Sequence, residues 1–224
     1  MHSAVLCASP RKDGNSWALA EAFAEGARAG NGTVELIDLN EATSGFLRDC
    51  KSCRRPDGTC SIEDGYPEML LEQLLPADAW VYSTPLYYYG MAAVLKNLFD
   101  RLVCYMSASY PDSEAVSDAI RGKRSALLMS AEERNQAAGL AVINQVQEVS
   151  RYLRQPFVGV VVGIGNRRGE VRFDPTDPLA AARELGATIG TAHHSDYNMD
   201  TERPNAVWAE ARAGEEGAGV YEDV

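Results

Sequence analysis

Apolar residues follow two patterns along the chain, short runs and longer stretches with helical spacing. Runs such as SAVLCA and FVGVVVGI are typical of buried strands, and TVELIDL alternates as a strand does. The stretches between them are rich in helix-forming residues, and the first stops at a Gly-Asn-Gly signal. We therefore predict strands at residues 3–8, 33–39, 79–84, 125–130 and 157–164, and helices at 15–29, 67–75, 92–106, 136–153 and 179–192.

This regular alternation of strand and helix predicts an α/β domain. Mostly continuous apolar strands joined through helices form a parallel sheet that is covered on both faces. In such sheets, ligands bind beyond the carboxyl ends of the strands, where the strand order reverses. The loops after the first, third, fourth and fifth strands are therefore the places to search for a site.

Composition narrows the classes of partner. The 224 residues suit one domain, and 46% of them are hydrophobic. The formal net charge of −11 disfavours nucleic acid and anionic membranes as partners. Residues 195–224 carry eight acidic and two basic residues without core periodicity, so we predict a compact domain at 1–194 and an acidic tail or arm at 195–224. Five cysteines, an odd number, and no expected signal peptide or membrane span indicate a reducing cytoplasm.

The loop after the first strand has the features of an anion site. It reads SPRKDGNSW and leads directly into a helix, whose first turn offers unpaired N–H groups and a partial positive charge. Ser9, Ser16 and Asn15 add polar donors, Arg11 adds a guanidinium, and Gly14 lets the backbone approach a ligand. Asn15 or Ser16 is also expected to cap the helix. The Gly-Lys-Ser/Thr ending of a nucleotide triphosphate loop is absent, so we predict a phosphate site of another kind.

The loop after the third strand is aromatic. Pro85 is followed by LYYYGM, which offers apolar and aromatic walls at another carboxyl end. Any single tyrosine here is expected to pack under the next helix. For the run as a whole, beside a phosphate loop, binding of a flat aromatic ring is the better interpretation.

Together these motifs carry a resemblance to a known family. SPRKxGNS after the first strand and TPLYxxGMxxxLKxxxDR after the third are similar to the flavodoxin-like NAD(P)H-dependent FMN reductases, and the stretch VVGIGNRRG is a weaker match. That family is related to the iron–sulfur flavoproteins and the flavodoxin-type quinone reductases. The resemblance covers about residues 3–192 and implies a flavodoxin-like three-layer sandwich whose five-stranded parallel sheet has the order 2-1-3-4-5.

The resemblance also implies a site for FMN. Its phosphate would be held by Ser9, Arg11, Asn15, Ser16 and the backbone of Trp17. One side of the isoalloxazine ring would meet Pro85, Leu86, Tyr87, Tyr88, Tyr89 and Gly90, and the other Ser130 and Ala131. The flavin supplies the chemistry, so we name no catalytic residue of the protein and no metal ligand.

The activity implied is electron transfer from NADH or NADPH through FMN to a small acceptor such as a quinone, a free flavin or a nitro or azo compound. The resemblance also implies a homodimer or homotetramer with FMN near the interface. The alternative is an FMN-binding electron-transfer protein, which could resemble an iron–sulfur flavoprotein and would be reduced by a protein partner.

The stretch CKSCRRPDGTC leaves several interpretations open. Cys50, Cys53 and Cys60 provide three thiols, and Pro56 stands where the iron–sulfur relatives have another cysteine. Both a cluster and structural zinc normally need four ligands. A redox pair of Cys50 and Cys53 is a further alternative, since the basic neighbours lower thiol pKa values. We interpret the three as plain loop thiols that shape the wall of the flavin pocket, and Cys7 and Cys104 as core residues.

Overall fold

The computed structural model describes residues 1–54, 58, 60–106 and 110–192, so the predicted tail at 195–224 lies outside the described residues. The strands are β1 His2–Cys7, β2 Thr33–Asp38, β3 Ala79–Tyr87, β4 Gly90–Met91, β5 Arg124–Ala131 and β6 Phe157–Ile164. The α-helices are α1 Asn15–Ala29, α2 Leu39–Ala42, α3 Tyr66–Glu68, α4 Ala93–Arg101, α5 Val103–Met106, α6 Ser113–Ile120, α7 Gln136–Tyr152 and α8 Pro178–Thr188. Three other helical turns are η1 Ser52–Arg54, η2 Met69–Leu74 and η3 Glu170–Phe173.

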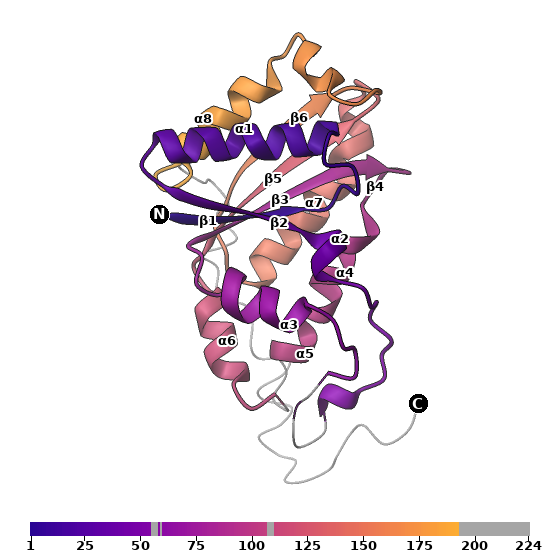
Figure 1. Cartoon of the computed structure of the whole chain (residues 1–224), viewed down its shortest axis with the longest axis vertical. Helices are drawn as coiled ribbons and strands as arrows, with labels where there is room; N and C mark the ends of the chain where they lie inside the picture. Colours follow the sequence, from indigo (N-terminus) through magenta and orange to yellow (C-terminus); the bar gives the residue numbers. More distant parts are fainter. Residues whose placement is uncertain (55–57, 59, 107–109, 193–224) are drawn as a thin grey trace. The chain divides into compact units, whose positions relative to one another are not determined.

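The sheet has the predicted topology. Its parallel strands lie in the order β2-β1-β3-β5-β6, which is 2-1-3-4-5 when only the parallel strands are numbered. A sixth strand, β4, was not predicted; it pairs antiparallel with the end of β3. Helices cover both faces of the sheet, with α1 and α8 side by side on one of them (Figure 1). The fold is therefore the expected flavodoxin-like sandwich.

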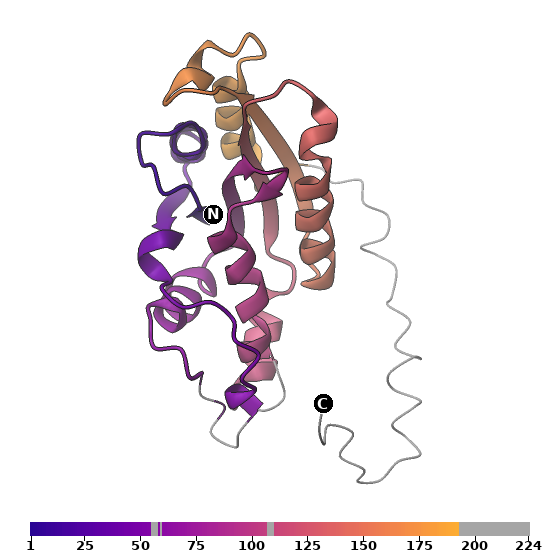
Figure 2. The same ribbon diagram turned by 90° about the vertical axis from the view of Figure 1, so that its right-hand side faces the viewer.

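Alternate residues of each central strand enter different cores. On β1, Val5 packs on the face covered by α1 and α8, whereas Leu6 faces the side of η2, α4 and α7. The view turned by 90° shows the sheet between its two helical layers (Figure 2). Because both faces are buried, the central strands β1, β3 and β5 read as continuous apolar runs rather than alternating ones.

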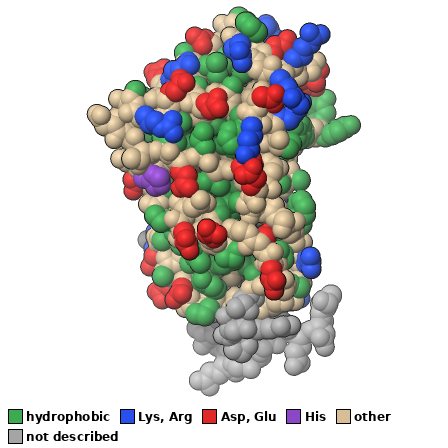
Figure 3. All heavy atoms as spheres, viewed as in Figure 1, with side chains coloured by type: hydrophobic (Ala, Val, Ile, Leu, Met, Phe, Trp, Pro, Cys, Tyr) green, Lys and Arg blue, Asp and Glu red, His purple; other side chains and the backbone are tan. Residues whose placement is uncertain are grey.

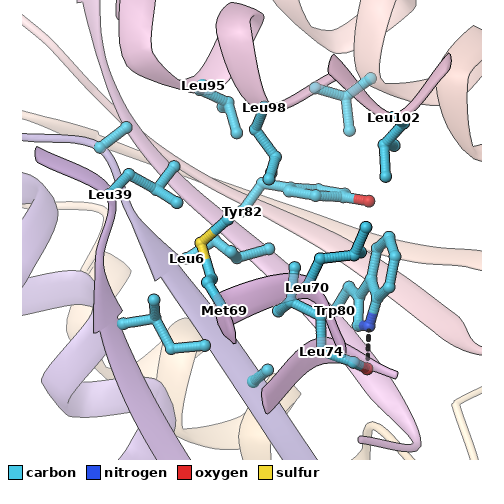
Figure 4. Close-up of a cluster of buried hydrophobic side chains, with 14 of the residues drawn as sticks. Leu6, Leu39, Met69, Leu70, Leu74, Trp80, Tyr82, Leu95, Leu98 and Leu102 are labelled. Carbon is cyan, nitrogen blue, oxygen red and sulfur yellow. Dashed lines mark hydrogen bonds between the residues drawn. The ribbon is translucent and has the colours of Figure 1, made fainter. Parts of the chain in front are cut away.

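The larger core lies beneath η2 and α4. Trp80 and Tyr82 of β3 are completely buried there among leucines of both helices (Figure 4). The Trp80 indole Nε1 donates a hydrogen bond to the Leu74 carbonyl oxygen at 2.8 Å, so its polar atom is satisfied within the core. This packing fixes the middle strand, whose carboxyl end carries the tyrosine run.

Two predicted helices are interrupted. The helix expected at 92–106 is divided into α4 and α5, because the amide of Leu102 bonds to the Phe99 carbonyl three residues earlier and tightens the turn. The helix expected at 67–75 is α3 followed by the π-helical η2, in which the Leu75 amide reaches back five residues to Leu70. The short helices α2 and α6 were not predicted, since four and eight residues are too few for apolar periodicity to stand out in a window of about 11–18 residues.

No described helix combines the length and the apolar composition that crossing a membrane requires.

Candidate functional site

A polar cavity of about 220 Å³ lies at the carboxyl ends of the parallel strands. Loops after β1, β3, β5 and β6 all contribute to it, as the topology requires. Nine of the thirteen residues predicted for the site line this cavity: Ser9, Arg11, Asn15, Ser16, Pro85, Leu86, Tyr87, Ser130 and Ala131. Trp17, Tyr88, Tyr89 and Gly90 are not among its lining residues.

The amino end of α1 is open toward a ligand. The residue at the N-cap position is Gly14, and no side chain caps the helix, so the expectation that Asn15 or Ser16 would do so is wrong. The first turn contains no acidic residue. A Cβ on Gly14 would lie 2.9 Å from the Arg11 carbonyl oxygen, so the tight turn before α1 favours glycine. The unpaired N–H groups and the helix dipole are therefore available to an anion.

Asn15 connects this turn to the loop after β6. Its Nδ2 donates to the Gly165 carbonyl oxygen at 2.8 Å, and its Oδ1 accepts a hydrogen bond from the Val171 amide at 3.2 Å. Gly165 lies so close that a Cβ there would be 2.7 Å from the Val171 nitrogen. Both polar atoms of Asn15 are thus used to position two walls of the cavity against each other.

Buried serines join α1 to the central strands. Ser16 Oγ and Ser130 Oγ are 2.7 Å apart, and the Ser83 hydroxyl donates to the Ser16 carbonyl oxygen at 2.8 Å. The buried Trp17 indole donates to the Ser9 carbonyl oxygen at 3.0 Å and so holds the loop after β1 in place. These contacts connect α1 to β3, to β5 and to the loop after β1 beside the cavity.

The charged residues that line the cavity are mostly basic. Arg11, Arg167 and Arg168 line it, against one acidic residue, Glu132. A guanidinium nitrogen of Arg11 donates to the Tyr87 hydroxyl at 3.3 Å, which links the loops after β1 and β3. The cavity therefore suits an anion in spite of the negative charge of the whole chain.

A carboxylate holds the loop after β6 at its other end. Asp174 accepts hydrogen bonds from the Ile164 amide at 2.7 Å and from the amide and hydroxyl of Thr176. Burial acts to raise the pKa of Asp174, but these hydrogen bonds outweigh it and lower the pKa below its usual value. Asp174 is therefore ionised at neutral pH and ties the end of β6 to the residues that follow this loop.

The tyrosine run is divided between cavity and solvent. Residues 87–90 form the turn between β3 and β4, and Tyr88 and Tyr89 both have positive φ, at 47° and 63°. This left-handed backbone is strained for tyrosine. Tyr87 lines the cavity, whereas Tyr88 is fully exposed and Tyr89 mostly so. Hydrophobic side chains project from this edge of the molecule (Figure 3).

An apolar cavity of about 300 Å³ adjoins the polar one and shares Ala131 with it. Its walls include Met129, Leu140, Ile143 and Val162 from β5, α7 and β6. A polar cavity next to an apolar one fits a ligand with a charged end and an uncharged, largely apolar part.

The cysteine loop lies elsewhere. Four thiols line a separate cavity of about 110 Å³: Cys50, Cys53, Cys60 and Cys104. This cavity shares no lining residue with the polar one, so within the described chain the thiols do not form a wall of that cavity. Cys104 is buried as predicted, but it also faces the loop thiols. In the described residues, no three His, Cys, Asp or Glu side chains are gathered in a way that could hold a metal ion.

A buried ion pair fixes this loop to α4. The Arg101 guanidinium is fully buried and donates to both carboxylate oxygens of Asp64, at 2.6 and 2.8 Å, and to the Gly45 carbonyl oxygen at 3.0 Å. It also stacks over the Tyr66 ring, 4.2 Å from its centroid. Burial acts to raise the pKa of Asp64, but the hydrogen bonds from Arg101 and the backbone lower it to about 2. Sequence analysis did not identify this pair.

Comparison with known proteins identifies the family. The sequence model of the NADPH-dependent FMN reductases matches residues 1–168. The chain belongs to this family. FMN is therefore its cofactor and NAD(P)H the electron donor, and the protein is an oxidoreductase.

Individual relatives agree with this assignment. A Bacillus subtilis (strain 168) protein named as an NAD(P)H-dependent FMN-containing oxidoreductase is 27% identical over 83% of this chain and 97% of its own length. An iron–sulfur flavoprotein of Archaeoglobus fulgidus is 24% identical over 89% of this chain and 84% of its own. The solved structure of an NAD(P)H:quinone oxidoreductase from Methanothermobacter marburgensis has the same fold, with a TM-score of 0.63 at 23% identity over 87% of this chain and 99% of that one.

The structure adds residues that sequence reasoning missed. Arg167 and Arg168 join the cavity from the loop after β6, where the stretch NRRG had been read only as part of a weak family match. Two adjacent arginines at a strand's carboxyl end were a usable signal. The approach of Cys104 to the loop thiols left no signal, because more than forty residues separate them in sequence.

Proposed function

We propose that the polar cavity binds the phosphate of FMN. The observation that supports this most directly is the open amino end of α1, which faces a cavity lined by Arg11, Arg167 and Arg168. Phosphate would accept hydrogen bonds from the first-turn N–H groups and the Ser9 hydroxyl, with Arg11 as a charged partner. Asn15 then acts by holding the loop after β6 beside the phosphate rather than through a free amide of its own.

The flavin ring would lie between the loops after β3 and β5. Pro85, Leu86 and Tyr87 form one side of the cavity, and Ser130 and Ala131 form another. Pro85 is the register partner of Ser130, so these two sides are adjacent at the ends of neighbouring strands. When bound, FMN accepts a hydride from NAD(P)H and passes electrons on, while the chain's residues bind and orient it.

The acceptor is proposed to be a small molecule such as a quinone, a free flavin or a nitro or azo compound. An apolar cavity beside the polar one offers room for a flat acceptor or for part of the donor. Family membership favours reduction by NAD(P)H over the alternative of an electron-transfer protein reduced by a protein partner. We propose a cytoplasmic location because all five cysteines lie among the described residues and are free, as in proteins of a reducing compartment.

Loss of Arg11 tests the phosphate site. We expect Arg11→Ala to raise the Kd of FMN about tenfold to a hundredfold, since hydrogen bonds to charged groups contribute about 1.5–3 kcal/mol. The measurement is fluorescence quenching of FMN titrated with flavin-free protein. Arg183→Ala is a matched control, because Arg183 on α8 pairs with Glu25 on the surface and is not among the residues that line the polar cavity. An unchanged Kd for Arg11→Ala would show that the phosphate binds elsewhere.

A homodimer or homotetramer is proposed with FMN near the interface. Tyr88 and Tyr89 support this proposal, because they are exposed, have a strained backbone and follow directly after Tyr87, which lines the cavity. Exposed aromatic side chains at such a place are suited to contact with a second copy of the chain. We expect Tyr88→Ser to shift the mass measured by light scattering toward the monomer at low protein concentration. Its FMN Kd should rise at the same concentrations. Tyr152→Ser, which also changes an exposed tyrosine, is the control for loss of aromatic surface. A wild-type protein that is monomeric with FMN bound contradicts the proposal.

A further inference from the structure

The four thiols of the cysteine cavity are brought together from two distant segments. Cys50, Cys53 and Cys60 belong to the loop around η1, and Cys104 belongs to α5. The pKa of Cys104 is raised to about 12. Burial is the largest cause, contact with the Cys53 thiol is the second, and Cys60 acts in the same direction. Cys104 therefore remains a protonated thiol at neutral pH, and it contacts Cys53 from inside the molecule.

Cys50 differs from the other three in exposure and in hydrogen bonding. It is the exposed member of the group, and its Sγ is 3.1 Å from the Ser61 hydroxyl. Hydrogen bonds from Ser52 and then Ser61 lower the pKa of Cys50 to about 7, so about half of it is thiolate at neutral pH. The two residues that flank it, Asp49 and Lys51, both have positive φ, at 48° and 56°. This strained backbone is the kind found at reactive positions.

Cys53 is the nearest thiol along the chain. It lies three residues after Cys50, in the one-turn 3₁₀ helix η1, and is only partly exposed. The loop around both is tied to α4 by the Arg101–Asp64 pair and by the hydrogen bond from the Leu47 amide to Asn97 Oδ1 at 3.1 Å. The pair is thus an exposed, ionisable thiol and a second, partly exposed thiol that lines the same cavity on an anchored loop.

We propose that Cys50 and Cys53 form a peroxide-reactive thiol pair, in which Cys50 is oxidised first and Cys53 then closes a disulfide with it. The Cys50 thiolate attacks one oxygen of hydrogen peroxide, the O–O bond breaks, and the leaving hydroxide takes up a proton to become water. The Cys53 thiol attacks the resulting sulfenic acid, the S–O bond breaks, and a second water leaves as the S–S bond forms. Two thiols lose two electrons, and the peroxide gains them.

The family chemistry supplies a source of oxidant, because reduced flavin that meets dioxygen instead of its acceptor yields hydrogen peroxide. Thiol oxidation is favoured over metal binding, since the described His, Cys, Asp and Glu side chains form no group of three that could hold an ion. Oxidation of Cys50 requires exposure, which it has, and no prior gathering of ligands.

Peptide mapping after peroxide treatment tests the proposal. Reduced full-length protein is exposed to a small excess of hydrogen peroxide and quenched, and its free thiols are counted. We expect a loss of two thiols per chain and a Cys50–Cys53 disulfide, both reversed by dithiothreitol. In Cys53→Ser, a sulfenic acid at Cys50 should be trapped by dimedone. Cys50→Ser should lose no thiols at the same peroxide dose.

Two further variants separate this pair from its neighbours. Cys60→Ser, in the same cavity, should still form the Cys50–Cys53 disulfide. Ser61→Ala should slow peroxide consumption at pH 7 by about threefold to tenfold, and raising the pH should restore the rate, because the smaller thiolate fraction is the cause. A disulfide that omits Cys50, oxidation of Cys50→Ser at the wild-type rate, or zinc or iron bound at about one per chain and lost in Cys104→Ser would each overturn the proposal.

Discussion

The polar cavity and the cysteine cavity are built in different ways. The polar cavity lies where four loops leave the carboxyl ends of parallel strands, so the sheet itself positions it. The cysteine cavity lies in the loop around η1, which the buried Arg101–Asp64 ion pair and the hydrogen bonds of Asn97 hold against α4. The same chain thus uses topology to place one site and a few side-chain contacts from α4 to place the other.

The difference predicts how each site responds to damage. The polar cavity is held by several small contacts, including the Ser16–Ser130 and Asn15–Gly165 hydrogen bonds, so losing one should leave the rest. The cysteine cavity should loosen when the Arg101–Asp64 pair is lost. The Ser44 and Gly45 amides of the same loop also donate to Asp64, so the position of this carboxylate affects several contacts at once. We therefore expect a large loss of stability from variants of the Arg101–Asp64 pair and a small loss from variants of the serine hydrogen bonds.

Removing Arg101 should have the largest effect. Arg101→Met leaves Asp64 buried without its partner, which typically costs about 3–5 kcal/mol of unfolding free energy. Urea unfolding measures this loss. Lys96→Met is the matched control on the same helix, since the partly exposed Lys96–Asp100 pair should contribute less than about 1 kcal/mol. Equal losses in the two variants would contradict the role assigned to the buried pair.

Acid should weaken the same anchor. The folded pKa of Asp64, about 2, lies below its unfolded value near 4, so its contribution is complete above pH 4 and is lost as the pH falls toward 2. We expect roughly 2 kcal/mol of unfolding free energy to disappear over that range. Asp64→Asn should lower stability at neutral pH and show a smaller loss between pH 4 and 2. An unchanged acid slope in Asp64→Asn would assign the acid sensitivity to other carboxylates, such as Asp174.

A pair of serines on one strand gives the smallest and most selective test. Ser130→Ala breaks the buried bond to Ser16 beside the polar cavity, and Ser125→Ala breaks the bond to Ser150, 2.9 Å long, at the other end of β5. Each should cost about 1 kcal/mol of unfolding free energy. Only Ser130→Ala should also raise the FMN Kd, by about threefold to tenfold. Equal Kd values in the two variants would remove Ser130 from the site.

Much of the fold and part of the site follow from local patterns. The predicted helix at 15–29 has the bounds of α1, and the five predicted parallel strands are confirmed. Their order, which the family resemblance rather than a local pattern implied, is confirmed as well. Ser9, Arg11 and Pro85 line the cavity because a strand's carboxyl end and its following loop are adjacent in sequence. The short β4 and the break after Arg101 were missed, since two residues carry no periodicity and a single tightened turn leaves no pattern.

The sequence by itself determined the alternation of strands and helices, the family motifs and the loops at the switch point, because all of these depend on residues close together in the chain. Tertiary structure decided the rest. It directed Tyr87 into the cavity and Tyr88 to solvent through two left-handed residues, and it set Arg101 against Asp64. It also brought Cys104 to Cys53, a contact between segments that only the packing of α5 against η1 creates. Such contacts depend on the whole fold, and no local pattern encodes them.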